Sequence, residues 1–206
     1  MPVIGVTGGI ASGKSSVTLL LGTCFRETEG LTVETFSADA CAHDLLEKDP
    51  DVLDAVVEIF GNVVIDISGQ VSRAVLRGIV FQEPEKRAQL EAVLHPRIRR
   101  RWETQAERFR QPTHYYVAEI PLLYETGCEI LFDSVIVVEA SAQIQIERLS
   151  SKRGWSLETA RQVIDAQMPA EQKIRKANIL ILNHHTEKLL AHQVELAARA
   201  LITRYA

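Results

Sequence analysis

The chain has 206 residues, of which 46% are hydrophobic and 24% are charged, and its formal net charge is −4. This composition is ordinary for a globular protein and excludes a disordered tail, a collagen-like repeat and a strongly basic chromatin-type protein. The length fits one domain, or one core with insertions.

Short apolar runs alternate with stretches of helical periodicity along the chain. In chain order the pattern predicts a strand at 3–7, a helix at 14–25, a strand at 31–36, helices at 39–47, 51–60, 72–81 and 84–110, strands at 115–120 and 134–139, helices at 142–151 and 157–167, a strand at 179–182 and a helix at 186–205. Pro96 lies inside the 84–110 helix, and we expect it to bend or split that helix because proline lacks a backbone donor. Ser156 is expected to cap the helix at 157–167 with its side chain alone, because Thr159 stands where a reciprocal capping box needs Glu or Gln.

Five buried strands separated by helices predict an α/β fold with a parallel sheet that is covered on both faces. The gap between the second and third strands is too long for one crossover helix, so it is interpreted as a helical insertion. We therefore expect a nucleotide-binding core at 1–40, 112–147 and 178–206, a helical acceptor domain at 41–111 and a lid at 148–177. The whole is predicted to be a three-layer fold of the P-loop kinase type.

The strongest local signal is a phosphate-binding loop between the first strand and the first helix. Its residues, which match G-x-x-x-x-G-K-[ST] and continue into the helix, are Gly8, Gly9, Ile10, Ala11, Ser12, Gly13, Lys14, Ser15 and Ser16. Backbone amides of such a loop and the helix N-terminus bind phosphate oxygens, Lys14 reaches the β- and γ-phosphates, and Ser15 is a ligand for Mg²⁺. The alternative is a glycine-rich turn with an incidental lysine. The pattern favours a nucleoside triphosphate as ligand.

The chain lacks the N-K-x-D motif of a switch GTPase, and it lacks the long apolar strand ending in Asp that is typical of a motor ATPase. Its size and two helical insertions favour a small-molecule kinase. Asp39 follows the second strand, at the sheet edge where parallel α/β proteins bind ligands. It is a candidate for orienting and deprotonating an acceptor hydroxyl, and the alternative is a helix N-cap.

Taken together, the motifs resemble the dephospho-coenzyme A kinase family over nearly the whole chain. The segments that carry the resemblance are the loop at 7–15, Ala38-Asp39, the segment at 73–81, Leu94-His95-Pro96, Pro121-Leu122-Leu123-Tyr124-Glu125, the segment at 145–149 with Arg153, Ala166-Gln167-Met168, Lys176-Ala177-Asn178 and Asn183. The resemblance implies transfer of a phosphoryl group from ATP to the ribose 3′-hydroxyl of dephospho-CoA, which gives CoA and ADP in the final step of coenzyme A biosynthesis.

The resemblance also implies roles for single residues. Asp39 matches the catalytic base, Arg148 matches a lid arginine that reaches the ATP phosphates, and Lys14 and Asn183 belong to the nucleotide site. The acceptor region is matched by Asp39, Arg73, Leu76, Arg77, His95, Pro121 and Leu122.

Five positions depart from the family pattern: Ala11, Ser37, His43, Glu119 and Asn178. Ala11 replaces a loop glycine, and we expect alanine to suffice there only if its φ angle is negative. None of the departures removes a phosphate-binding group, so activity is expected to survive, while the magnesium shell and the preference for ATP over GTP stay open.

Two segments are basic within this acidic chain: eight basic and four acidic residues lie at 84–110, and seven basic and three acidic residues lie at 148–176. In a kinase such cations stabilise the transferred phosphoryl group. A solvated helix face is the alternative for Arg99–Arg101, and nucleic-acid binding is disfavoured by the net charge and by the lack of interleaved aromatic residues. His95 is either structural or a hydrogen-bonding group for the acceptor, and His184-His185 is expected in a surface loop.

Three cysteines without paired spacing, Cys24, Cys41 and Cys128, argue against a disulfide framework and against a cysteine zinc site. The N-terminus lacks a signal-peptide pattern, and the apolar runs at 135–138 and 179–182 are far shorter than the roughly 20 residues of a membrane-spanning helix. We therefore expect a cytoplasmic monomer or weak homo-oligomer that binds small molecules and neither nucleic acid nor a membrane. A kinase for another acceptor and a regulator that binds ATP without transfer are the alternatives.

Overall fold

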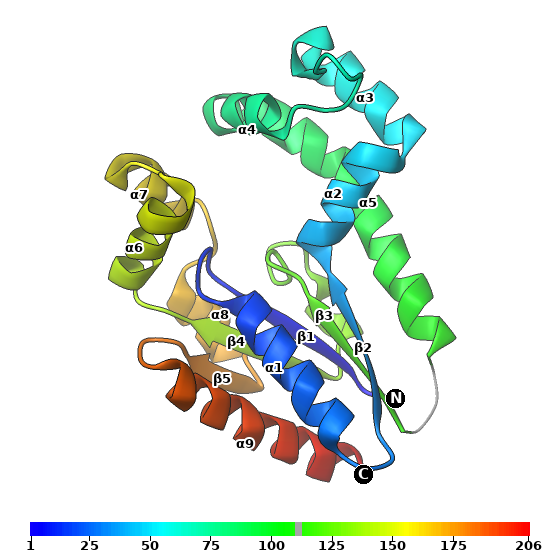
Figure 1. The fold of residues 1–206 in the computed structure, drawn as a ribbon, viewed down its shortest axis with the longest axis vertical. Helices are drawn as coiled ribbons and strands as arrows, with labels where there is room; N and C mark the ends of the chain where they lie inside the picture. The colour runs from blue at the N-terminus through cyan, green and yellow to red at the C-terminus, as the bar shows by residue number, and fades with distance from the viewer. Residues whose placement is uncertain (110–112) are drawn as a thin grey trace. The chain divides into compact units, whose positions relative to one another are not determined.

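The computed structural model describes residues 1–109 and 113–206. The chain forms two compact units (Figure 1), one made of Met1–Ser37 together with Ala106–Ala206 and the other made of Ala38–Gln105. We call them the sheet unit and the helical unit. The expected helix end at Arg110 and the expected domain boundary at 111–112 lie outside the described residues.

The sheet unit contains a five-stranded parallel sheet in the order β2-β3-β1-β4-β5. Its strands are β1 (Val3–Gly8), β2 (Thr32–Ser37), β3 (His114–Glu119), β4 (Ser134–Glu139) and β5 (Ile179–Leu182). Its helices are α1 (Lys14–Glu27), α6 (Ala142–Arg153), α7 (Leu157–Asp165), α8 (Ala170–Lys176) and α9 (Glu187–Tyr205), with a short 3₁₀ turn η2 (Cys128–Leu131). The α/β fold with a five-stranded parallel sheet is confirmed.

The main hydrophobic core lies between one face of this sheet and helices α1 and α9. Ile4 of β1 is fully buried there, and Phe25 of α1 stacks on Tyr115 of β3 with 4.4 Å between ring centroids. On the opposite face a Cβ at Gly5 would lie 2.6 Å from the side chain of Leu123, so the chain after β3 lies directly on the sheet. Each large apolar side chain buried in this way contributes about 1.5–3 kcal/mol.

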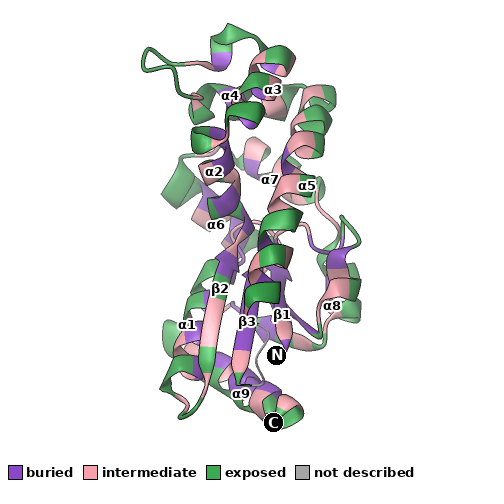
Figure 2. Cartoon of the chain, turned by 90° about the vertical axis from the view of Figure 1, so that its right-hand side faces the viewer, coloured by how far each residue is buried: buried purple, intermediate pink, exposed green. Residues whose placement is uncertain are grey.

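The expectation that all five strands are buried is wrong for the two edge strands. Thr32 and Thr35 of β2 are exposed, and Leu180 and Leu182 of β5 are 40% and 41% exposed. Figure 2 shows the contrast between β2 and the purple, buried β3. An edge strand has a neighbour on one side only, so adjacent elements cover it less completely than they cover β1, β3 and β4.

Side-chain caps begin several helices of the sheet unit. The Ser156 hydroxyl accepts a hydrogen bond from the Thr159 amide at 3.1 Å, and the two side-chain oxygens lie 2.9 Å apart. This confirms the predicted cap by Ser156 at the start of α7. Thr186 caps α9 in the same way, through the Leu189 amide at 3.4 Å.

The helical unit consists of α2 (Ala38–Lys48), α3 (Pro50–Phe60), a 3₁₀ turn η1 (Asn62–Val64), α4 (Arg73–Gln82) and most of α5 (Pro84–Arg108). Its interior is apolar and includes Leu45, Val56 and Val64, all at most 1% exposed. Asp49 caps α3 by accepting from the amides of Asp51 and Val52.

Of the two effects expected of Pro96, a split of the long helix is wrong, because α5 runs through it as one helix, while a bend stays a prediction. Proline lacks the N–H that would donate to the carbonyl four residues earlier, so one ladder hydrogen bond, to Ala92, is lost. The Arg97 guanidinium donates to the adjacent Val93 carbonyl at 2.9 Å.

Candidate active site

The phosphate loop connects the end of β1 to the start of α1, at the carboxyl edge of the sheet. Gly13 has a φ of 98°, and a Cβ there would lie 2.1 Å from the Asn183 amide nitrogen. A Cβ at Gly8 would lie 2.1 Å from the Val138 carbonyl oxygen of the neighbouring strand β4. Glycine is therefore required at both ends of the loop by backbone conformation and by close approach.

Ala11 corrects one expectation about this loop, because its φ is +56° and not negative. Among the described residues it is the one non-glycine residue with positive φ. The left-handed region costs an L-residue with a Cβ about 1–2 kcal/mol. The loop keeps this conformation in spite of the alanine, so surrounding contacts must hold it.

Arg148 and Asn183 supply those contacts. The Arg148 guanidinium donates to the carbonyls of Ala11 and Ser12, at 3.0 and 3.2 Å, and to the Asn183 carbonyl at 3.2 Å. The Asn183 side-chain amide donates to the Ser12 carbonyl at 2.8 Å. Both predicted nucleotide-site residues thus lie against the loop. In this geometry Arg148 is directed at loop carbonyls, and reaching a phosphate would require it to give up some of these bonds.

The loop also presents the polar groups expected of an anion site. Lys14 is buried, and its ammonium group donates to the Gly9 carbonyl at 3.0 Å. The Ser15 hydroxyl donates to a carboxylate oxygen of Glu119 at 2.8 Å. The buried Ser12 hydroxyl has no hydrogen-bond partner among the described residues.

Ser15 and Glu119 meet because β3 lies beside β1 in the sheet, where Val6 and Glu119 are register partners. The pair brings a hydroxyl and a carboxylate oxygen to the same point, and these are the donors that Mg²⁺ prefers. The residues therefore fit a magnesium ion at this edge. Glu119 stood out in the sequence only as a departure from the family pattern, and its partnership with Ser15 depends on sheet order, which the sequence does not display.

Pro121 and Leu122, predicted for the acceptor region, follow β3 and are both partly exposed. The Pro121 carbonyl accepts from the Thr7 hydroxyl at 3.1 Å, which ties this turn to β1. Tyr124, two residues after Leu122, is buried, and burial raises the pKa of its phenol to about 12. The phenol therefore stays neutral across the physiological range.

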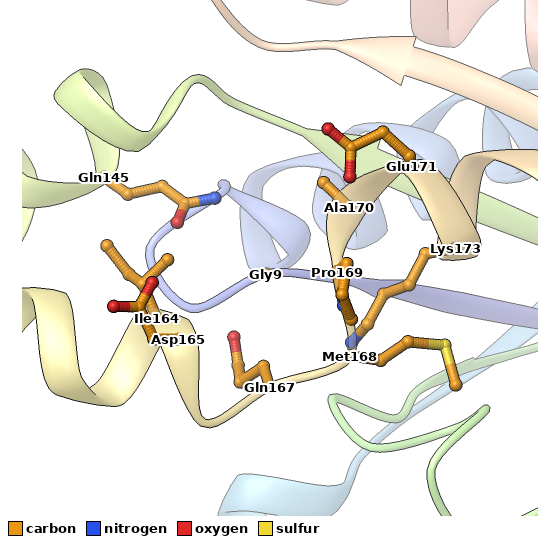
Figure 3. A pocket seen from close by; sticks show the side chains of 10 residues that line it. All are labelled: Gly9, Gln145, Ile164, Asp165, Gln167, Met168, Pro169, Ala170, Glu171 and Lys173. Atoms are coloured by element: carbon orange, nitrogen blue, oxygen red, sulfur yellow. The ribbon is translucent and has the colours of Figure 1, made fainter.

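A hollow of about 350 Å³ lies beside the loop, between it and the α7–α8 segment (Figure 3). Its lining residues include Gly9, Gln145, Gln167 and Lys173. Lys173 is only 1% exposed. Sequence reasoning gave no role to Gln145, Gln167 or Lys173, although the first two lie in segments that carry the family resemblance.

The other predicted acceptor residues belong to the helical unit. Asp39 is exposed and is the second residue of α2, so it lies inside the first turn and is not the N-cap. Arg73 and Arg77 are exposed one turn apart on α4, while Leu76 is only 4% exposed. His95 is partly exposed on α5.

The two adjacent histidines follow β5 and Asn183. His184 pairs through Nε2 with Glu139 at the end of β4, and His185 is exposed. Within residues 1–109 and 113–206, no group of three or more His, Cys, Asp or Glu side chains is arranged to hold a metal ion. In the same ranges, no helix has the length and apolar character needed to cross a bilayer.

The sheet order, the phosphate loop and the helical insertion together define the chain as a P-loop kinase. A solved shikimate kinase from Bacteroides thetaiotaomicron has the same fold at 14% identity, with a TM-score of 0.53 over 98% of both chains. The dephospho-CoA kinase family model matches residues 2–188, so the chain belongs to the dephospho-CoA kinase family.

Relatives at the level of sequence and structure agree with this assignment. The chain is 38% identical to a dephospho-CoA kinase of Bacillus anthracis over 89% of both chains. It is also 38% identical to that of Symbiobacterium thermophilum, over 97% of this chain and 81% of the relative. The solved dephospho-CoA kinase from Campylobacter jejuni has 25% identity and a TM-score of 0.70, over 99% of this chain and 98% of that one.

Proposed function

We propose that this chain transfers the γ-phosphoryl group of ATP to the ribose 3′-hydroxyl of dephospho-CoA, giving CoA and ADP in the cytoplasm. The observation that carries the proposal is an intact phosphate loop, with Lys14 and Ser15 at the sheet edge, in a chain that matches the family over 2–188. The reaction forms a bond between the 3′-oxygen and the γ-phosphorus and breaks the bond to the bridging oxygen, which leaves with ADP.

In this proposal the loop from Gly8 to Ser16 binds the triphosphate through its amides and through Lys14. Asn183 and Arg148 hold the loop carbonyls, which keeps the amides directed at the phosphates. Arg148 is also the candidate cation for the transferred group, provided that it exchanges a carbonyl for a phosphate oxygen. Positioning and fixed charge are the main means by which proteins catalyse phosphoryl transfer.

Ser15 and Glu119 would hold Mg²⁺, since the hydroxyl and the carboxylate already lie 2.8 Å apart. When bound, the ion would neutralise charge that develops on the phosphate oxygens. Glu119 is 5% exposed, and its burial keeps the carboxylate in one position beside the loop.

Asp39 would orient the 3′-hydroxyl and accept its proton. Arg73 and Arg77 are exposed cations suited to the phosphates of the acceptor, and His95, Pro121 and Leu122 complete the proposed acceptor site. Leu76 is buried, so it would act by fixing the two arginines on α4 rather than by direct contact.

The test measures ADP release with ATP, Mg²⁺ and, in separate reactions, dephospho-CoA, AMP, shikimate or pantothenate. Release that depends on dephospho-CoA supports the proposal, and release with only another acceptor refutes the substrate. Tight ATP binding without acceptor-dependent release would instead identify a regulator. Lys14→Ala and Asp39→Asn should each lose turnover while remaining folded, whereas Asp54→Asn, an exposed control on α3, should not. Near-normal turnover in Asp39→Asn would remove Asp39 from the mechanism.

A further inference from the structure

One amide of the phosphate loop is held by a side chain that is distant in sequence. The Ile10 N–H donates to the side-chain oxygen Oε1 of Gln167 at 2.8 Å, across 157 residues of chain. In Figure 3 the Gln167 side chain rises from the segment between α7 and α8 toward the loop at Gly9. Gln167 thus contacts the element that binds phosphate in this fold class.

The backbone around Gln167 is fixed from its other side. The Met168 amide donates to a carboxylate oxygen of Glu125 at 3.2 Å, and the same oxygen pairs with the Lys173 ammonium group at 2.7 Å. Lys173 is almost fully buried, so this ion pair is only weakly screened by water. Gln167 is therefore positioned by contacts of its own segment and not by the loop alone.

Gln167 lies at the end of the loop where the terminal phosphates bind. The lysine of a phosphate loop reaches the β- and γ-phosphates. Here the Lys14 ammonium group lies 3.0 Å from the Gly9 carbonyl, and Gly9 and Gln167 line the same hollow. The carboxamide of Gln167 is thus beside the γ-phosphate end of the loop.

The orientation of this carboxamide follows from its bond to the loop. A backbone N–H can donate only to the oxygen, so the Ile10 contact assigns Oε1 to the loop side and leaves Nε2 as a donor. Nε2 has no hydrogen-bond partner among the residues that the structure describes. Asp165 and Glu171 also line the hollow and would repel an anion there. Gln145 also lines the hollow, but its Nε2 already donates to the Ala140 carbonyl at 2.9 Å. Gln167 therefore offers a neutral donor next to the loop amide.

We propose that Gln167 donates a hydrogen bond from Nε2 to a non-bridging oxygen of the γ-phosphoryl group, while Oε1 stays on the Ile10 amide. Gln167 would then distinguish a triphosphate from a diphosphate and orient the group that is transferred. The inference rests on the proposed function only in taking ATP as the nucleotide, and it makes no use of the acceptor.

The test measures binding without any acceptor, by titration calorimetry with Mg²⁺ and either ADP or the non-hydrolysable analogue AMP-PNP. In Gln167→Ala, AMP-PNP should bind about tenfold or more weakly, as expected for a lost hydrogen bond to a charged group, while ADP binds as in the wild type. Gln167→Glu keeps an oxygen for the Ile10 amide but loses the donor and adds a charge, so AMP-PNP should bind it more weakly still. Gln172→Glu places the same charge on an exposed position of α8 and should change neither affinity.

The pattern across these variants separates a phosphate contact from a purely structural one. If Gln167 only supports the loop, Gln167→Glu will bind AMP-PNP better than Gln167→Ala does, or both variants will lose ADP and AMP-PNP equally, and either result overturns the proposal. Thermal midpoints within about 2 °C of the wild type would show that the variants fold. Failure of dephospho-CoA as acceptor would leave these binding ratios untouched, so the two proposals fail separately.

Discussion

Replacement of Ala11 by glycine should stabilise the sheet unit, because Ala11 has a φ of +56°. Relief of the left-handed conformation is worth about 1–2 kcal/mol. Glycine also gains freedom in the unfolded chain, which takes back about 0.4–1 kcal/mol. The free energy of unfolding should therefore rise by roughly 0.5–1 kcal/mol, or about 1–4 °C in Tm for a protein of this size.

Differential scanning calorimetry of Ala11→Gly measures this shift directly. Gly127→Ala is the matched control, because Gly127 has a φ of +65° and no heavy atom within 4 Å of a Cβ built there. The control introduces the strain that Ala11→Gly removes, so its Tm should fall by a similar amount. A fall in the Tm of Ala11→Gly would refute the reasoning, since the backbone at Ala11 would then not be strained.

Three further predictions concern packing and charge away from the loop. Tyr205→Phe removes the hydroxyl that lies 2.7 Å from the fully buried Ser134 hydroxyl, and should cost about 1–3 kcal/mol in chemical denaturation. The Lys176 hydrogen bond lowers the pKa of Glu129 below its ordinary value of 4.5, so this pair stabilises the fold above that pH and stops doing so as the pH falls through the lowered pKa. The stability difference between the wild type and Lys176→Gln should accordingly shrink toward zero in acid, and a constant difference would contradict the assignment. Gln193 bonds both backbone groups of one residue in the edge strand β5, at 3.0 and 2.9 Å, so Gln193→Ala should increase light scattering on mild heating.

The strands and the phosphate loop could be predicted because their signals are local. Four of the strands are short apolar runs, whereas the second mixes apolar residues with Thr and Glu. The structure places all five within one residue of the predicted bounds. Burial could not be predicted equally well, because β5 looks like a central strand in sequence but lies at a sheet edge, as β2 does. Strand order depends on the packing of helices that are distant in sequence. An apolar run predicts a strand, but it does not predict which strands lie beside it in the sheet.

Helix interruption at Pro96 was predicted from an intrinsic preference and did not occur. The missing amide hydrogen removes a single ladder hydrogen bond, to the Ala92 carbonyl, from a helix of 25 residues. Propensity describes a residue in isolation, whereas the helix continues because its other hydrogen bonds and its packing outweigh one lost bond. The phosphate loop likewise adopts a conformation that the preference of one residue alone would not predict.

At Ala11, the expectation of a negative φ failed because four hydrogen bonds from other elements act on the loop. Arg148 and Asn183 hold the carbonyls of Ala11 and Ser12, and Gln167 holds the amide of Ile10. A sparsely populated backbone conformation persists when its surroundings determine it from several sides. Three of the groups that do so, Arg148, Gln167 and Asn183, come from one stretch of chain that returns to the loop after β4. The composition of the loop itself therefore identifies the phosphate site, while that returning stretch explains how the site keeps its shape with an alanine in a glycine position.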